Sequence, residues 1–162
     1  MHIYEILSLA LQAVAKELQV NGVITEKWRG EEYGAREFGS FDNEIAFRLE
    51  RCASTFFGIT QFGCHVNGYV QTKAQLSLWI ATRDASKQIA PNKLDTITGG
   101  GLPLDISPHD NMLKEIQEEA GLIPEESALC ATGVISYVND EMRGFKHGTM
   151  VYTFSVVHSG KF

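Results

Sequence analysis

Hydrophobic residues at the N-terminus recur with the spacing of an amphipathic helix. Between Ile3 and Leu18 an apolar residue falls at every third or fourth position, which places these side chains along one side of an α-helix. Gly22 follows, and glycine commonly ends helices. The pattern predicts a helix that ends near Gly22. Its apolar side consists of Ile3, Ile6, Leu7, Ala10, Leu11, Val14 and Leu18.

The pattern that follows is less regular. Residues 26–40 mix glycines with charged residues and indicate a loop with an irregular strand. Residues 44–53, EIAFRLERCA, fit a strand and a short helix equally well, because a short apolar run does not distinguish the two. Two strands are then predicted at about Cys64–Thr72 and Leu76–Arg83, and the short polar segment between them indicates a hairpin.

One helix with clear end signals follows a glycine-rich segment. A short strand leads into the glycines at 99–101, and a helix is predicted over Pro108–Ala120. Ser107 suits the N-cap, proline suits the first helical position, and Gly121 suits the C-terminal cap. Two further strands are predicted at residues 130–140 and 149–157. Together these elements predict an α+β fold or an α/β/α sandwich.

Composition narrows the classes of function. The chain has 162 residues and is 44% hydrophobic, which suits one domain with a core, with or without an appendage. Its net charge of -6 and pI of about 5.3 argue against nonspecific nucleic-acid binding, which relies on a basic surface. An acidic protein can still bind a phosphorylated substrate when a divalent cation lies between them.

The cysteines and the N-terminal apolar run indicate the cellular compartment of the protein. Cys52, Cys64 and Cys130 are far apart and form no CxxC pair, so buried free thiols in a reducing compartment are expected. The uncharged run from Ile6 to Ala15 is too short to span a bilayer. These features predict a cytoplasmic protein with no membrane partner.

Three glutamates on the Pro108–Ala120 helix carry the strongest chemical signal. Glu115, Glu118 and Glu119 are three and four positions apart, so they share a side of the helix. Like charges at i,i+4 repel by ~0.2–0.5 kcal/mol per pair, and a cation between them would remove that cost. Carboxylates with a glycine run nearby suit Mg²⁺ and a phosphate-bearing ligand. The apolar side of the same helix is predicted to hold Leu113, Ile116 and Ala120. A merely solvated acidic face is the alternative.

The segment GGGLPLDISPHDNMLKEIQEEAGL, which begins at Gly99, resembles the Nudix box, G-x5-E-x7-R-E-U-x-E-E-x-G-U with U aliphatic. The box starts at Gly100, and its spacing holds without a gap. Two positions depart: Ile106 stands where the family has Glu, and Lys114 where it has Arg. The positions that match are Glu115, Ile116, Glu118, Glu119, Gly121 and Leu122.

The resemblance implies a Nudix-like α/β/α sandwich with a mixed sheet at residues 58–162. Residues 1–57 would then form an N-terminal helical and irregular appendage. It implies hydrolysis of a diphosphate linked to another group, with Mg²⁺ as cofactor and Mn²⁺ as a substitute. The small-molecule diphosphate is the expected partner, and a homodimer is an open option.

The same resemblance implies roles for single residues. Glu115, Glu118 and Glu119 would hold the metal and serve catalysis, and the backbone carbonyl of Gly99 or Gly100 would complete the shell. Relatives often use another acidic residue outside the box as base or extra ligand. The candidates here are Asp140 and Glu141, for which an ordinary exposed turn is an equal alternative.

Segments outside the box resemble a narrower group, the Nudix proteins related to the one fused to thiamine pyrophosphokinase in fungi. The resemblance runs from about Asn21 to Val157. It implies that thiamine diphosphate or its oxidised or damaged analogues are cut to the monophosphate plus phosphate. The segments are NGVITEKWRGEEY, FGITQFGCHVNGYV, LDTITGGGLP and VISYVNDEMRG.

Four residues are candidates for binding the substrate. The Trp28 indole could stack on a ring and Arg29 could bind a phosphate, although Trp28 fits a core position equally well. Strand alternation places His65 and Asn67 on one face, opposite Cys64, although a structural histidine is the plainer reading.

Two other functions stay open: hydrolysis of ADP-ribose or another nucleoside diphosphate derivative, and a non-catalytic binding module of the same fold.

Overall fold

The computed structural model describes residues 2–37, 41–87, 90–123, 128–140 and 146–157. The chain divides into two compact units, which we describe separately. The first comprises Met1–Phe62, Leu102–Ile106 and Ser136–Met150, and the second comprises Gly63–Gly101, Ser107–Ile135 and Val151–Phe162. No helix among the described residues is both long and apolar enough to cross a membrane.

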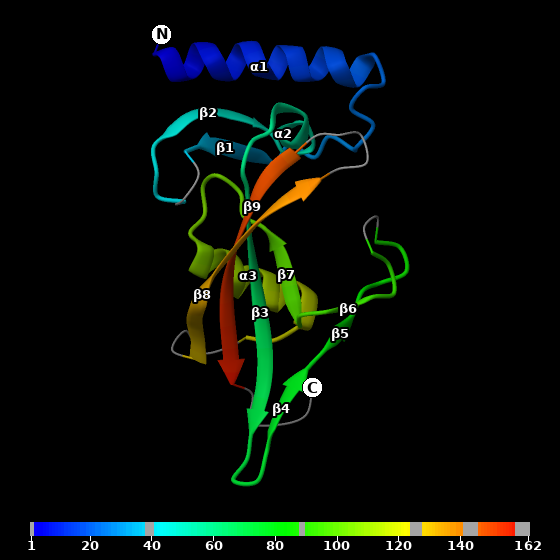
Figure 1. Ribbon diagram of the computed structural model, residues 1–162, viewed down its shortest axis with the longest axis vertical. Coiled ribbons are helices and arrows are strands. Elements are labelled where there is room, and N and C mark those ends of the chain that lie inside the picture. Colours follow the sequence, from blue (N-terminus) through cyan, green and yellow to red (C-terminus); the bar gives the residue numbers. More distant parts are fainter. Residues whose placement is uncertain (1, 38–40, 88–89, 124–127, 141–145, 158–162) are drawn as a thin grey trace. The chain divides into compact units, whose positions relative to one another are not determined.

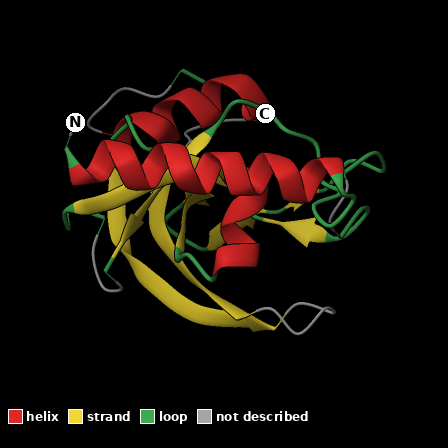
Figure 2. Cartoon of the chain, turned by 90° about the horizontal axis from the view of Figure 1, so that it is seen from above, coloured by secondary structure: helices red, strands yellow, loops and turns green. Residues whose placement is uncertain are grey.

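The N-terminal elements of the first unit pack a helix against a two-stranded sheet. They are α1 (Ile3–Val20), β1 (Glu32–Arg36), β2 (Ile45–Glu50), α2 (Arg51–Ser54) and a 3-10 turn at Thr55–Phe57. In both views α1 is one unbroken helix (Figure 1, Figure 2). The strands β1 and β2 pair antiparallel, with Tyr33 opposite Leu49. The segment 44–53, which was ambiguous in sequence, is therefore strand first and helix after.

The buried face of α1 differs from the predicted stripe. Ser8 and Ala15 are buried, whereas Ile6 and Val14 are 47% and 45% exposed. The helix turns its small residues toward β2, because a narrow side chain lets the two elements approach closely. Its core partners are Ile24, Ala35, Leu49, Ala53 and Ile59, with Leu11, Leu18, Trp28, Phe47, Cys52, Phe56 and Phe57 packed around them.

The second unit is organised along one long strand. β3 (Gln61–Gln71) pairs antiparallel with β7 (Thr98–Gly101) through Gly63–Val66 and with β4 (Leu76–Trp79) through Gly68–Gln71. The sheet continues from β3 to β9 (Lys146–Val157) and then β8 (Leu129–Asp140).

The predicted β3–β4 hairpin is confirmed, but the second strand is shorter than expected. The predicted strand Leu76–Arg83 is interrupted at Ile80. Its second part is β5 (Ala81–Thr82), which pairs instead with β6 (Leu94–Asp95). Alternation along the chain does not reveal such a change of partner, because both parts keep an extended backbone.

The helix α3 (Pro108–Ala120) has the bounds that the sequence predicted. The Ser107 hydroxyl accepts a hydrogen bond from the Asp110 backbone N–H, and Gly121 ends the helix with a left-handed φ of 66°. Its buried residues are Asn111, Met112 and Ile116, so the expected apolar side of Leu113, Ile116 and Ala120 is right only at its centre. The elements as a whole confirm the α+β class.

The expectation of buried thiols is correct for only part of the cysteines. Cys64 is buried on β3, Cys52 is half-buried and Cys130 is exposed. Burial raises the pKa of the Cys64 thiol to about 12, so the thiol is protonated at neutral pH. The neighbouring Asn111 amide donates a hydrogen bond to the Gly101 carbonyl at 3.1 Å, which helps to fix α3 against β7.

Candidate active site

The carboxylate of Glu115 lies directly against the backbone of β7. A β-carbon added at Gly100 would lie 2.8 Å from the carboxyl carbon of Glu115 and 2.9 and 3.0 Å from its two oxygens. Such distances are too short for real contacts, so only glycine lets the carboxylate approach this closely. The glycine run of the sequence therefore makes room for an acidic side chain of α3.

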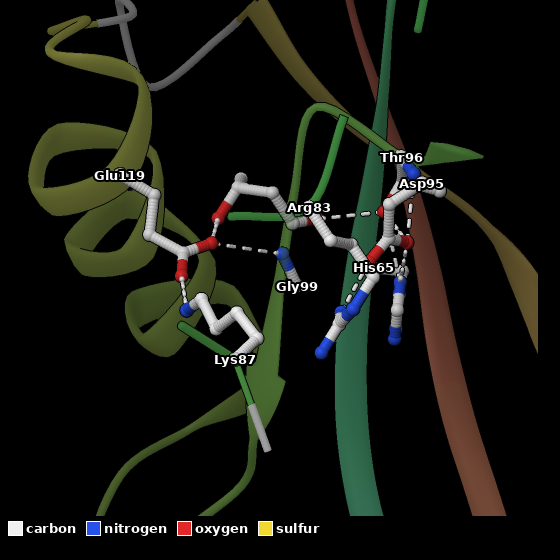
Figure 3. Close-up of polar contacts among 8 residues, drawn as sticks. His65, Arg83, Lys87, Asp95, Thr96, Gly99 and Glu119 are labelled. Carbon is white, nitrogen blue, oxygen red and sulfur yellow. Dashed lines mark hydrogen bonds and ion pairs between the residues drawn. The ribbon is translucent and has the colours of Figure 1, made fainter. Parts of the chain in front are cut away.

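Glu119 reaches the same strand one turn further along α3 (Figure 3). Its Oε2 accepts a hydrogen bond from the Thr98 hydroxyl at 2.7 Å and from the Gly99 backbone N–H at 3.4 Å. The ammonium of Lys87 lies 3.3 Å from its Oε1. Partial burial by itself would raise the pKa of Glu119, but these hydrogen bonds outweigh burial and lower it. Glu119 is therefore anionic at neutral pH.

Glu118 faces solvent rather than β7. Its side chain is 58% exposed and lies 3.8 Å from the ammonium of Lys114, four residues earlier on the helix. Within the part of the chain that the structure describes, no three His, Cys, Asp or Glu side chains converge as metal ligands. Glu115 and Glu119 thus flank the β7 backbone, while Glu118 stands at the exposed edge.

His65 covers Gly99, the first of the three glycines of β7. A β-carbon at Gly99 would lie 2.5 Å from the His65 Nδ1, so the imidazole fills the space that a side chain would take. The predicted alternation on β3 is correct: Cys64 and Val66 are fully buried, whereas His65 is half-buried and Asn67 is exposed. Burial lowers the pKa of His65, against the opposing charge of Asp95, so the imidazole is neutral at neutral pH.

Thr96 links His65 to the neighbouring backbone of β7 (Figure 3). The Thr96 hydroxyl lies 2.9 Å from the His65 Nδ1, 3.0 Å from the Thr98 carbonyl and 3.4 Å from the Asp95 carboxylate. These contacts hold the imidazole in place through its Nδ1. Arg83 binds the other Asp95 oxygen and, together with the Thr96 N–H, keeps the pKa of Asp95 low despite partial burial.

Trp28 and Arg29 belong to the first unit. The half-buried Trp28 packs against its core cluster, and the Lys16 ammonium lies 3.7 Å from the centre of the indole ring. The Arg29 backbone N–H donates to the buried Glu50 at 2.9 Å, while the side chain is exposed. Their substrate-binding role stays a prediction. Glu141 lies outside the described residues, as does the side chain of Asp140.

Comparison with known proteins identifies one matching family model and several similar proteins. Residues 2–61 match a family described as a domain of unknown function, DUF4743. Nudix hydrolase 20, chloroplastic, from Arabidopsis thaliana is 40% identical over 112 residues, 68% of this chain and 30% of the relative. Nudix hydrolase 24, chloroplastic, from the same plant is 42% identical over 102 residues, 62% of this chain and 28% of the relative. The chain therefore spans less than a third of the length of these relatives.

A solved structure agrees at the level of the fold. The MutT/nudix family protein from Enterococcus faecalis superposes with a TM-score of 0.50 at 17% identity, over 60% of this chain and 36% of that one. The chain is thus similar in sequence to plant Nudix hydrolases and has a Nudix-like fold. The boundary expected between residues 57 and 58 stays a prediction.

The Nudix box residues suit a hard divalent cation in their chemistry. Mg²⁺ prefers carboxylate and carbonyl oxygens, and Glu115 and Glu119 present carboxylates on either side of the β7 glycines. The closeness of Glu115 to Gly100 is the observation that supports the fit, because any larger residue would displace the carboxylate. Of the two departures from the Nudix pattern, Lys114 pairs with Glu118, and Ile106 is half-buried in the first unit.

Several residues of the site were missed from the sequence. Thr98 could have been found, because strand alternation places it on the Gly100 side of β7. Lys87, Arg83 and Asp95 gave no signal. They lie on or beside the β5–β6 strands, and only the folded chain brings them to α3 and β3.

Proposed function

We propose that this chain is a metal-dependent Nudix hydrolase that cleaves a diphosphate linkage. Two observations support it together: the curated relatives are named Nudix hydrolases, and Glu115 and Glu119 approach the Gly99–Gly100 backbone from one helix. The second observation carries the proposal, because the close approach has a chemical use only if anionic oxygens are to be concentrated there.

The metal ligands that we propose are those implied by the Nudix resemblance. Glu115, Glu118 and Glu119 would hold Mg²⁺ or Mn²⁺, with the carbonyl of Gly99 as a further oxygen ligand. A bound cation would supply neutralisation of the diphosphate charge and activation of water. Thr98 orients the Glu119 carboxylate through its 2.7 Å hydrogen bond. His65 and Asn67, on one face of β3, would contact the substrate. Asp140 and Glu141 stay the candidates for the base or an extra metal ligand.

The substrate that we propose is thiamine diphosphate or an oxidised analogue, cut to the monophosphate plus phosphate. The support is the narrower resemblance of the segments around Trp28, His65, Gly99 and Val138. Hydrolysis of ADP-ribose or another nucleoside diphosphate derivative is the outcome that would replace this substrate.

A second candidate is a Nudix-fold binding module without catalysis. Two observations favour it: Glu118 turns away to Lys114, and three acidic or histidine ligands do not converge among the described residues. Such a module would bind a diphosphate compound and leave it intact.

A panel of diphosphates separates these functions. Phosphate release is measured from thiamine diphosphate, its oxo and oxy analogues, ADP-ribose and nucleoside diphosphates, with Mg²⁺ and with EDTA. We expect turnover that EDTA abolishes, with kcat/KM highest for a damaged thiamine diphosphate. Good turnover of ADP-ribose alone would reject the thiamine substrate. Binding of a panel member without any turnover would favour the module.

Compartment and assembly are part of the proposal. We propose a cytoplasmic enzyme that acts without nucleic acid, because the chain is acidic, with a net charge of -6. The two plant relatives are named chloroplastic, so imaging of the tagged full-length protein is the test. Light scattering of the purified protein distinguishes a monomer from a homodimer, which is an open option.

A further inference from the structure

The ammonium of Lys87 lies beside Glu119, where a divalent cation is expected to bind. It is 3.3 Å from the Glu119 Oε1, and the two side chains are 50% and 35% exposed. The other oxygen of the same carboxylate is bound by Thr98 and Gly99. The lysine thus occupies the accessible oxygen of Glu119 (Figure 3).

The backbone that carries Lys87 is fixed by a tight turn. The Asp84 carboxylate accepts hydrogen bonds from the Ser86 N–H at 2.7 Å and the Ser86 hydroxyl at 2.6 Å. The Lys87 N–H donates to the Asp84 carbonyl at 3.1 Å. The ion pair between Arg83 and Asp95 connects this turn to β6. Because the backbone is held, the long lysine side chain is the part that can change its contacts.

We propose that Lys87 is a substrate-binding residue that neutralises Glu119 until the divalent cation binds and then contacts the phosphates of the substrate. This inference rests on the proposed function. An ammonium and a divalent cation cannot both occupy Oε1 of Glu119, because they repel each other and compete for the same lone pairs. The displaced ammonium stays within a side-chain length of the cation, since its backbone is fixed. A diphosphate bound to that cation presents the anionic oxygens that a lysine binds.

The competing explanation is a plain surface ion pair that attaches the β5–β6 turn to α3. Exposed ion pairs of this kind contribute little to stability. Under either explanation, removing the Lys87 ammonium frees Glu119 for a cation, so the two explanations differ in the binding of the diphosphate. Removing Lys87 should weaken the binding of a diphosphate to the metal-loaded protein if Lys87 contacts the phosphates, and should leave it unchanged if the pair is only structural.

The first measurement is binding of Mn²⁺ alone to the full chain, followed by electron paramagnetic resonance. Lys87→Ala should bind Mn²⁺ about two- to fivefold more tightly than the wild type. This factor corresponds to the free energy of a typical exposed ion pair, which the cation no longer has to break. Lys93→Ala is the matched control, because Lys93 is an exposed lysine beside the same strands and its removal changes the net charge equally. It should bind Mn²⁺ as the wild type does.

The second measurement is binding of methylenediphosphonate, which resists hydrolysis, at saturating Mn²⁺. Lys87→Ala should weaken this affinity about tenfold or more, as expected for a lost hydrogen bond to a charged group. Lys87→Arg should restore most of it, and Lys93→Ala should not change it. The paired result, tighter metal and weaker diphosphonate, is one that a merely structural lysine would not give.

The outcomes separate the two proposals. If Lys87→Ala matches Lys93→Ala in both measurements while Glu119→Gln loses Mn²⁺, the role of Lys87 is refuted and the proposed metal site stands. If the wild type and Glu119→Gln bind Mn²⁺ alike, the metal site itself is refuted, and the inference on Lys87 is refuted with it.

Discussion

The helices α1 and α3 are both amphipathic in sequence, yet their ends are set differently. α3 begins with a hydrogen bond from the Asp110 N–H to the Ser107 hydroxyl and ends at the left-handed Gly121. α1 begins at His2, whose side chain makes no capping hydrogen bond. Where capping residues are present, the sequence fixes a helix end to the residue, because the cap is a local contact.

The two helices also differ in which of their residues are buried. α3 buries Asn111, Met112 and Ile116 in the second unit and turns two carboxylates toward β7. α1 buries Ser8 and Ala15, while Leu9 is 60% exposed and Val20 is 84% exposed. A hydrophobic pattern therefore predicts that a helix forms, but the shape of the packing partner decides which side is buried.

The largest expected effect is on catalysis, and it comes from comparing an acidic residue of α3 with one of α1. Glu119→Gln should lower kcat/KM by roughly 100-fold or more, because even outer-shell partners of a metal are worth ~10–100-fold. Glu17→Gln, on an exposed position of α1, should leave it unchanged. Phosphate release is measured for both variants, with circular dichroism to check folding. Full activity with tight Mg²⁺ binding in Glu119→Gln would disprove the assignment of the metal face.

An intermediate effect contrasts two glycines. Gly100→Ala should lower kcat/KM by about 10- to 100-fold, because its methyl group displaces the Glu115 carboxylate. The cost in stability should be small, since Glu115 is a flexible side chain. Gly22→Ala, after α1, meets no atom within 4 Å but has a φ of +71°. It should cost ~1–2 kcal/mol of stability with normal kinetics. Equal effects of both changes on both quantities would contradict this contrast.

The smallest effect tests the helix ends. Ser107→Ala removes the acceptor for the Asp110 N–H and should cost ~1 kcal/mol, seen as a lower melting temperature. His2→Ala should leave the melting temperature unchanged, because His2 makes no side-chain cap. Kinetic constants should change little in either variant. A drop in melting temperature for His2→Ala alone would reverse the comparison.

Much of the candidate site was predictable from residue types and spacing. The bounds of α3 follow from its capping residues, and the shared face of His65 and Asn67 follows from strand alternation. The placement of the glutamates near the glycines was implied by the Nudix resemblance. The contact of Glu118 with Lys114 is an i,i+4 pair, but the sequence did not show that Glu118 faces solvent while Glu119 faces β7. The position of Lys87 was not predictable either, since no local pattern links it to Glu119.

The spacing of the Nudix box and the ends of α3 were determined by the sequence itself, because they depend on residues a few positions apart. Only the tertiary structure decided that Glu115 lies on Gly100 and that Glu119 binds Thr98 and Lys87. It likewise decided that the Thr96 hydroxyl lies within hydrogen-bond distance of His65 Nδ1. These contacts join segments that are distant in the chain, and a hydrogen bond or close approach between such segments depends on how the strands pair and how α3 packs against them.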